Sequence, residues 1–255
     1  PLDRASGQGF HLQFYPWTRN EDIKNIGLSF RPSLRHSPII IMCGIAGIIS
    51  SNPSHQDSLL PMARLLRHRG PDDEGFIFLS GKKVSHLAGA ETHASSVIHH
   101  DLSGCMIENF DLDHASFGLA HRRLSIIDLS PNGHQPMTRD GKVWIAYNGE
   151  AYNYLEIRAE LESVGISFTT ESDTEVVLAA YERWGTESFS RLNGMWAMAI
   201  LDLRNERVIL SRDRFGIKPL YVYADGNALA FASEIKSFQA IPGWKAKANE
   251  GAIHD

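Results

Sequence analysis

Cys43 is the residue with the clearest potential for chemistry, because it directly follows a methionine, Met42. If the chain began at Cys43, a thiol and a free α-amino group would lie side by side. Such an amine has a pKa of about 7.7–8.0, so it can serve as the general base for the thiol near neutral pH. Forty-one residues precede Met42, however, and a peptide bond turns the amine into a non-basic amide. The chain as written is therefore predicted to be inactive until Cys43 becomes an N-terminus.

Four further polar motifs follow Cys43 at intervals. They are residues 68–72 (HRGPD), 121–128 (HRRLSIID), 147–150 (YNGE) and 172–175 (SDTE). Each also has a purely structural interpretation. A cysteine in an apolar strand is usually an inert buried residue, Asn-Gly is a strong signal for a hairpin turn, and a carboxylate at a helix start is a good cap. Taken singly, the motifs leave both interpretations open.

The composition excludes several classes of protein. The chain has 255 residues, of which 43% are hydrophobic and 22% charged, as in one large or two small globular domains. A net charge of -5 argues against a nucleic-acid partner, which would need a basic face. Two cysteines cannot form a disulfide framework, and their scarcity predicts a reducing, cytoplasmic location.

No membrane partner is expected either. The longest apolar stretch, residues 39–49, is shorter than the roughly 20 residues that span a bilayer. A lipoprotein signal ending at Cys43 is an alternative, but the apolar run before the cysteine is short and Met42 is not the small residue that such a cleavage site needs.

Short apolar segments and a few helical ones follow Cys43 without a long polar linker, which predicts one compact α+β domain. Strands are expected at residues 43–49, 75–79, 117–120, 143–148, 195–202, 208–212, 220–224 and 228–233. Helices are expected at residues 59–67, 154–164 and 174–184. Gly165 and Gly185 provide helix stops, and residues 172–175 have the spacing of a capping box.

Residues 85–115 differ from the rest because they contain five histidines among Ser, Asp and Gly. A metal site is one interpretation. A solvated insertion loop is favoured, because these histidines lack a paired ligand spacing.

Two more motifs, residues 212–221 (RDRFGIKPLY) and 232–236 (ASEIK), complete an ordered set. Together the motifs resemble the glutaminase domain of glutamine-dependent asparagine synthetase, a class II glutamine amidotransferase and N-terminal-nucleophile hydrolase. The resemblance covers residues 42 to about 238. It implies the four-layered α/β/β/α sandwich of that family, with the catalytic cysteine at the start of the first strand and L-glutamine as the substrate.

The resemblance assigns catalytic roles to three residues. Cys43 corresponds to the nucleophile that forms a γ-glutamyl thioester and releases ammonia. The side-chain amide of Asn148 and the backbone N–H of Gly149 correspond to the oxyanion hole.

The resemblance also assigns the substrate contacts. Arg123 corresponds to the residue that holds the α-carboxylate, a task that suits a planar guanidinium. Glu150 and Asp173 correspond to positions that fix the amino group, and Leu124, Ser125, Ile126 and Ile127 are expected to continue a strand that lines the pocket. His121 is expected to be structural, Arg122 to be a surface charge or a structural pair, and the motifs 68–72 and 212–214 to form internal ion pairs and turns.

Three parts of the chain are expected. Residues 1–42 would be an N-terminal extension, or a leader that is either untranslated or propeptide-like. Residues 43–240 would be the glutaminase domain, and residues 241–255 the start of a connection to a synthetase domain. That further domain would use ATP and Mg to activate aspartate, whereas the glutaminase domain needs no metal or cofactor. A homodimer is one assembly that the resemblance allows.

Two alternatives stay open at this point. The chain could be an amidotransferase for another acceptor, such as a sugar phosphate, a phosphoribosyl donor or a polysaccharide precursor. It could also be a non-catalytic module that retains the fold.

Overall fold

Two β-sheets form the centre of the molecule in the computed structural model, which describes residues 11–15, 42–126 and 128–246. The order of the first sheet is β1-β9-β8-β7-β6, and that of the second is β10-β11-β2-β5-β3-β4. Within them only β1 and β9 pair in parallel. The first sheet contains β1 (His11–Tyr15), β6 (Met137–Thr138), β7 (Val143–Ala151), β8 (Gly194–Asp202) and β9 (Arg207–Arg212). The second contains β2 (Gly44–Ile49), β3 (Asp73–Ser80), β4 (Lys83–Leu87), β5 (Ala115–Arg123), β10 (Tyr221–Ala224) and β11 (Leu229–Ala232).

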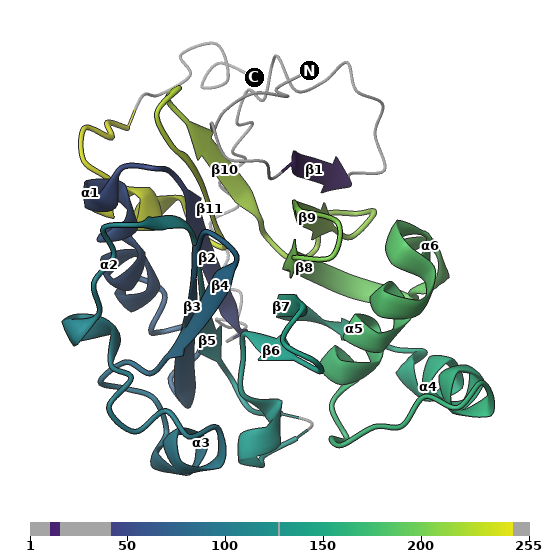
Figure 1. Cartoon of the computed structure of the whole chain (residues 1–255). Coiled ribbons are helices and arrows are strands. Elements are labelled where there is room, and N and C mark those ends of the chain that lie inside the picture. Colours follow the sequence, from purple (N-terminus) through teal and green to yellow (C-terminus); the bar gives the residue numbers. More distant parts are fainter. Residues whose placement is uncertain (1–10, 16–41, 127, 247–255) are drawn as a thin grey trace, which may run out of the picture.

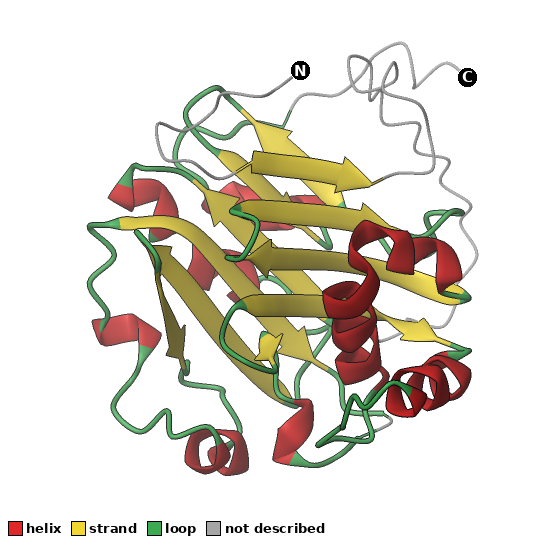
Figure 2. Ribbon diagram, turned by 45° about the vertical axis from the view of Figure 1, so that its right-hand side comes forward, coloured by secondary structure: helices red, strands yellow, loops and turns green. Residues whose placement is uncertain are grey.

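Helices cover the outer faces of both sheets (Figures 1 and 2). On the six-stranded sheet lie α1 (Pro53–Gln56) and α2 (Leu59–Arg64), and on the five-stranded sheet lie α4 (Tyr154–Ser163), α5 (Asp173–Trp184) and α6 (Ser188–Arg191). Away from the sheets, α3 (Ala94–His99) contacts the short 3₁₀ helix η3 (Pro131–Gly133). Three further 3₁₀ turns are η2 (Ile107–Asn109), η4 (Gly185–Glu187) and η5 (Ile235–Ala240). The predicted α/β/β/α sandwich is confirmed.

Three hydrophobic clusters hold these four layers together, and the strands contribute to them by alternation. In β2, Ile45 points between the two sheets, whereas Ala46 and Ile48 point toward α2. Because successive side chains leave a strand on opposite faces, a strand buried on both sides is apolar throughout. This explains why the sequence here is a continuous apolar run.

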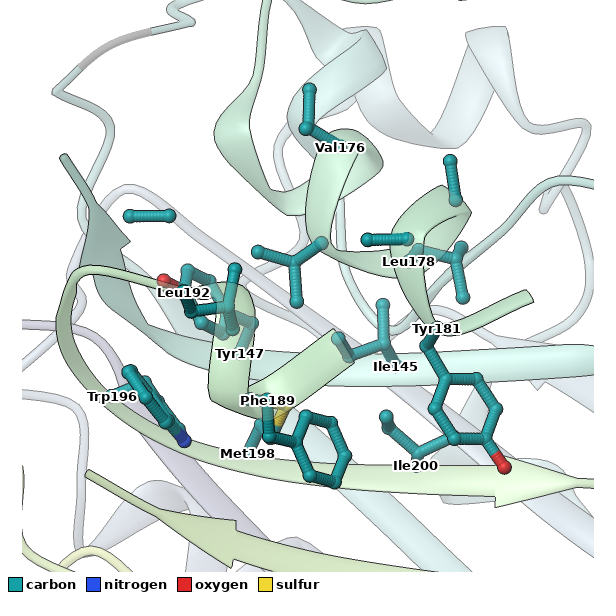
Figure 3. Packing of buried hydrophobic residues seen from close by; sticks show 14 of the residues in the cluster. Ile145, Tyr147, Val176, Leu178, Tyr181, Phe189, Leu192, Trp196, Met198 and Ile200 are labelled. Carbon is teal, nitrogen blue, oxygen red and sulfur yellow. The ribbon is translucent and has the colours of Figure 1, made fainter. Parts of the chain in front are cut away.

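The third cluster lies between the five-stranded sheet and its helices (Figure 3). Ile145 and Met198 rise from β7 and β8 toward Val176 and Leu178 of α5. The buried members of all three clusters lie between Ile45 and Ile241, and partly buried side chains of β1 (Leu12, Phe14 and Tyr15) pack against two of them.

The predicted elements are present, with ends that differ by up to three residues. Those missed are β1, β4, β6, α1, α3 and α6, all of six residues or fewer, for which periodicity gives little signal.

The start of α5 differs from the predicted capping box. The Ser172 side chain accepts a hydrogen bond from the Thr174 amide, as an N-cap should. The Glu175 carboxylate does not return to Ser172 and accepts instead from the amides of Thr169 and Thr170. Glu175 therefore fixes the preceding loop. Gly185, with φ of 61°, ends the helix as predicted.

Residues 85–115 are not the solvated loop that was favoured. The segment contains part of β4, α3 and η2, and the His86 ring packs against Trp144, His134 and His100 at centroid distances of 5.2, 5.2 and 5.8 Å. Burial lowers the pKa of His86 to about 3, so this imidazole is neutral at physiological pH. Ring packing therefore orders His86 and His100 of this segment.

Part of the segment before Met42 also packs on the domain. The strand β1 pairs with the edge strand β9, and the ring of Tyr15 lies 5.6 Å from that of Phe189. Arg207 donates a hydrogen bond to the Gln13 side chain at 3.2 Å.

Gly47 makes room for the Phe231 ring on the inner face of the six-stranded sheet. It pairs with Phe231 across β2 and β11, and a Cβ at this position would fall inside the Phe231 ring, which is fully buried in the core between the sheets. We expect Gly47→Ala to destabilise the protein by about 1–3 kcal/mol through overpacking, measured by denaturant unfolding. In a Phe231→Ala background the same substitution should cost clearly less, because the ring is gone. An equal cost in both backgrounds would contradict this account.

Candidate active site

A cavity of about 340 Å³ opens where the end of β5 and the start of β2 meet the end of β7. Both sheets and the start of α5 contribute to its wall. Its lining residues are Met42, Cys43, Arg123, Leu124, Ser125, Ile126, Asp128, Gly133, Gln135, Tyr147, Asn148, Gly149, Glu150, Ser172, Asp173, Thr174, Met195, Ile217 and Lys218. All of the predicted site residues that the structure describes are among them. Ile127 lies outside the described residues.

Cys43 is half-buried and immediately precedes β2. The Leu124 amide donates a hydrogen bond to its Sγ at 3.3 Å, and the Arg69 side chain donates to its carbonyl at 3.0 Å. Burial raises the pKa of the Cys43 thiol, while the Leu124 amide and the nearby Arg123 and Lys218 cations act in the opposite direction. The thiol is therefore held in place and remains largely protonated while Cys43 is in a peptide bond.

The motif 68–72 does more than form the internal turn that was predicted. The Arg69 guanidinium bridges the Cys43 carbonyl and the Glu234 carboxylate, at 3.0 Å from each. Asp72 accepts a hydrogen bond from the Ser125 amide at 2.8 Å. The turn therefore positions both the thiol and the loop that covers it. The HRGPD motif was the available signal for this role, since it couples an arginine to a tight turn.

Asn148 and Gly149 lie within β7, paired with Ala197 and Trp196 of β8, so the hairpin interpretation does not hold. The Asn148 side chain is 1% exposed, and its Nδ2 is buried without a hydrogen-bond partner among the described residues. An unpaired buried amide is costly unless a ligand supplies the acceptor. A Cβ on Gly149 would collide with the Met195 carbonyl, so the glycine allows the strands to pack here.

Arg123 ends β5 with its side chain in the cavity wall. Its Nη atoms donate to the backbone carbonyls of Ser130, at 3.0 Å, and of Asp128. A guanidinium carries five N–H donors, so three remain for a ligand. The guanidinium lies against Gly133, where a Cβ would displace it. Sequence reasoning missed Gly133.

Glu150 and Asp173 both line the cavity and supply negative charge. Asp173 begins α5, is buried, and accepts a hydrogen bond from the Ala151 amide at 3.0 Å. Burial raises the pKa of Asp173 to about 6, and the neighbouring Glu150 charge adds to this effect. An ammonium group bound between the two carboxylates would favour their ionised forms.

Leu124, Ser125 and Ile126 line the cavity as expected, but the prediction that they continue the strand is wrong. The strand β5 ends at Arg123, and Ile126 is 65% exposed. The pairing partner β3 begins at Asp73, opposite Arg123, so the ladder has no further partner there.

The structural interpretation of His121 is confirmed. It is buried, and its Nε2 lies 3.1 Å from the Tyr147 carbonyl, which links the two sheets. Burial lowers its pKa to about 3. Arg122 is a structural pair rather than a surface charge, since its Nη1 lies 2.5 Å from Glu74 and 2.8 Å from Glu91 in the interior.

Gln135 is a second residue that sequence reasoning missed. Its Oε1 accepts a hydrogen bond from the Tyr147 amide at 2.7 Å, and its Nε2 donates to the Thr174 hydroxyl at 3.2 Å. It therefore ties β7 to α5 beside Asn148. A side-chain amide that links distant segments leaves no signal in the sequence.

The described ranges contain neither a metal-ligand cluster nor a membrane-spanning helix. No group of three or more His, Cys, Asp or Glu side chains there could hold a metal ion. Of the helices described, none is long and apolar enough to cross a membrane.

Known proteins resemble this chain in sequence. A family model described as "Glutamine amidotransferase domain" matches residues 100–255. A putative glutamine-hydrolysing asparagine synthetase 2 of Methanocaldococcus jannaschii is 36% identical over 216 residues, covering 78% of this chain and 35% of the relative. Asparagine synthetase 1 of Bacillus subtilis is 38% identical over 202 residues, covering 77% of this chain and 26% of the relative. The chain thus spans about a quarter to a third of the length of these relatives.

Solved structures share the fold. A glutamine phosphoribosylpyrophosphate amidotransferase from B. subtilis superposes with a TM-score of 0.61 at 24% identity, covering 78% of this chain and 43% of that one. This is the fold of the N-terminal-nucleophile amidotransferases. On the family match, the chain belongs to the glutamine amidotransferase domain family, and within it resembles glutamine-hydrolysing asparagine synthetases.

Proposed function

We propose that this chain is the glutaminase part of an asparagine synthetase, which hydrolyses L-glutamine to glutamate and ammonia. One observation carries the proposal: the Cys43 thiol, the unpartnered Asn148 amide, Arg123 and the Glu150 and Asp173 carboxylates all line one cavity. Its volume of about 340 Å³ suits an amino acid. The cation and the two carboxylates match the opposite charges of the α-carboxylate and α-ammonium of glutamine.

The chemistry begins with a free amino group on Cys43. This amine takes the thiol proton while the sulfur attacks the side-chain amide carbon of glutamine. The resulting oxyanion accepts hydrogen bonds from the Asn148 side chain and the Gly149 amide. The C–N bond then breaks, the amine returns its proton to the leaving nitrogen, and ammonia departs. Water, deprotonated by the same amine, cleaves the γ-glutamyl thioester to give glutamate and restores the thiol.

The ammonia acceptor belongs to a proposal about the whole protein. Two relatives are named asparagine synthetases, which supports aspartate as the ammonia acceptor. A synthetase domain would activate the aspartate with ATP and Mg²⁺. The proposed steps of glutamine hydrolysis use neither ATP nor Mg²⁺. A relative with a different name, amidase chry2 of Gibberella zeae, is 34% identical over 220 residues, covering 80% of this chain and 28% of that protein, so an acceptor other than aspartate stays the second candidate. The homodimer and the cytoplasmic location stay predictions.

Removing the nucleophile tests the proposal directly. Intact mass spectrometry of the expressed protein first identifies molecules that begin at Cys43. For that form, Cys43→Ala should reduce glutamate release on the order of a thousandfold or more, because no other thiol lines the cavity. The matched control is Cys105→Ala, which removes an exposed thiol and should leave turnover unchanged. Normal hydrolysis by the Cys43 variant, with a native circular dichroism spectrum, would refute the assignment.

Substrate binding through Arg123 gives a second test. Arg123→Lys retains the charge but loses the planar donor pair, so KM for glutamine should rise about 10- to 100-fold with little change in kcat. Gly133→Ala, which displaces the guanidinium without altering it, should act in the same direction. The surface substitution Arg64→Lys serves as the control. An unchanged KM in Arg123→Lys would exclude this residue from the substrate site.

The pH dependence of binding tests Asp173. Because its pKa is about 6, the carboxyl is neutral at lower pH and no longer attracts the substrate ammonium. We expect KM for glutamine to be level above pH 7 and to rise below pH 6, approaching about tenfold per pH unit. Asp173→Asn should have a high KM that no longer changes over this range. The exposed Glu171→Gln should keep the wild-type profile, and a rise in KM that persists in Asp173→Asn would assign the titration to another group.

A further inference from the structure

Lys218 places a buried positive charge beside the nucleophile. The residue is 3% exposed and follows β9 in a turn that lines the cavity. Among the described residues its Nζ has one hydrogen-bond partner, the Met42 sulfur at 2.8 Å, and no carboxylate forms an ion pair with it. A thioether is a weak acceptor, so the ammonium is poorly compensated. A buried cation without a close counter-charge is costly, and such groups are enriched at functional sites.

The turn that carries Lys218 is rigid. The Asp213 carboxylate accepts hydrogen bonds from the amides of Phe215, Ile217 and Lys218 at 3.0, 2.9 and 3.0 Å. Arg212 donates to the Lys218 carbonyl at 2.8 Å from the other side. The motif 212–221 therefore fixes the lysine backbone on both sides, beyond the internal ion pairs and turns that were predicted for residues 212–214.

The position of Nζ indicates what it would face in a processed chain. Met42 is bonded to the Cys43 nitrogen, and both residues line the cavity together with Lys218, so loss of Met42 removes the hydrogen-bond partner of the ammonium and opens an α-amino group in the same cavity wall. The charges around this point are the cations Arg69, Arg123 and Lys218 and the anions Asp72, Asp128, Glu150, Asp173, Asp213 and Glu234. Burial lowers the pKa of Lys218, whereas the Glu150 carboxylate favours its charged form.

We propose that Lys218 is a positioning residue for the nucleophile: its ammonium keeps the α-amino group of a free Cys43 unprotonated, so that the amine is available as the general base. This inference rests on the proposed glutaminase function. Like charges repel, so a second cation next to the amine disfavours its protonated form. The same charge favours the thiolate, and thus both effects prepare the pair for attack.

The direction of the Lys218 effect on activity is the same whether the shared proton lies on the Cys43 amine or on the Cys43 thiol. The active pair is an amine with a thiol, or equally an ammonium with a thiolate, and in both forms its net charge is zero. One further proton gives an ammonium with a thiol, which has a net charge of +1 and is inactive. Lys218 disfavours each protonation of the pair, and its effect on the step to the inactive +1 form is the one that sets the acid limb of the activity profile.

The test compares wild type, Lys218→Met and Lys218→Arg in the form that begins at Cys43, which retains all the buried members of the three clusters. For Lys218→Met, the acid limb of the kcat/KM profile should move upward by about one pH unit, with kcat/KM below the limb about tenfold lower. KM for glutamine should not change. Lys218→Arg, which keeps the charge, should retain the wild-type limb, as should the exposed control Lys83→Met.

A second readout does not depend on glutamine turnover. Alkylation of the Cys43 thiol by iodoacetamide, followed against pH in a Cys105→Ala background, should have a higher midpoint in Lys218→Met than in wild type. If wild-type protein that begins at Cys43 did not hydrolyse glutamine, the proposed glutaminase function would be contradicted. The alkylation midpoints would still test the proposed effect of Lys218 on the Cys43 pair. If Lys218→Met does not fold, as judged by thermal melting, Lys218→Gln replaces it. Unshifted profiles, or a change confined to KM, would overturn the proposal.

Discussion

The face-to-face packing of two sheets is the constraint on which the rest of the structure depends. Every strand near the interface buries side chains on both faces, and Gly47 lets the Phe231 ring fit between the layers. This packing brings β2 and β5 of one sheet against β7 of the other. Cys43, which precedes β2, and Asn148, in β7, therefore line one cavity although about a hundred residues separate them in sequence.

Polar groups at this junction are placed by contacts that cross between layers. The His121 ring reaches from β5 to the Tyr147 carbonyl in β7, and Gln135 joins the amide of the same residue to α5. Such buried hydrogen bonds are directional, whereas apolar packing alone leaves small shifts open. The hydrophobic layers therefore set the overall distance between the sheets, and the polar links orient the strand that carries Asn148.

The sequence predicted the layers well because their signal is local. An apolar run such as residues 43–49 is visible without knowing its partners, and so are the glycine stops of the helices. Features that depend on contacts with distant residues were harder to predict. Asn148-Gly149 has the local signature of a turn, yet pairing with β8 keeps it in a strand. The stretch after Arg123 has strand-forming residues but no neighbouring strand, so it forms a loop. Arg69, Gly133 and Lys218 acquire their roles only through contacts with distant residues.

Met42 shows why the position of the N-terminus affects both the chemistry of Cys43 and the size of the cavity. Its side chain forms part of the cavity wall and contacts the Lys218 ammonium, while its carbonyl carbon occupies the bond that would otherwise be a free amine. Loss of Met42 would therefore do three things together: create the base, enlarge the cavity beside the thiol, and leave a buried cation facing the new amine. The buried members of the three clusters all lie beyond this point, and Met42 is not among the residues packed against them. Removal of Met42 would therefore make a catalytic group without taking a side chain from the hydrophobic core.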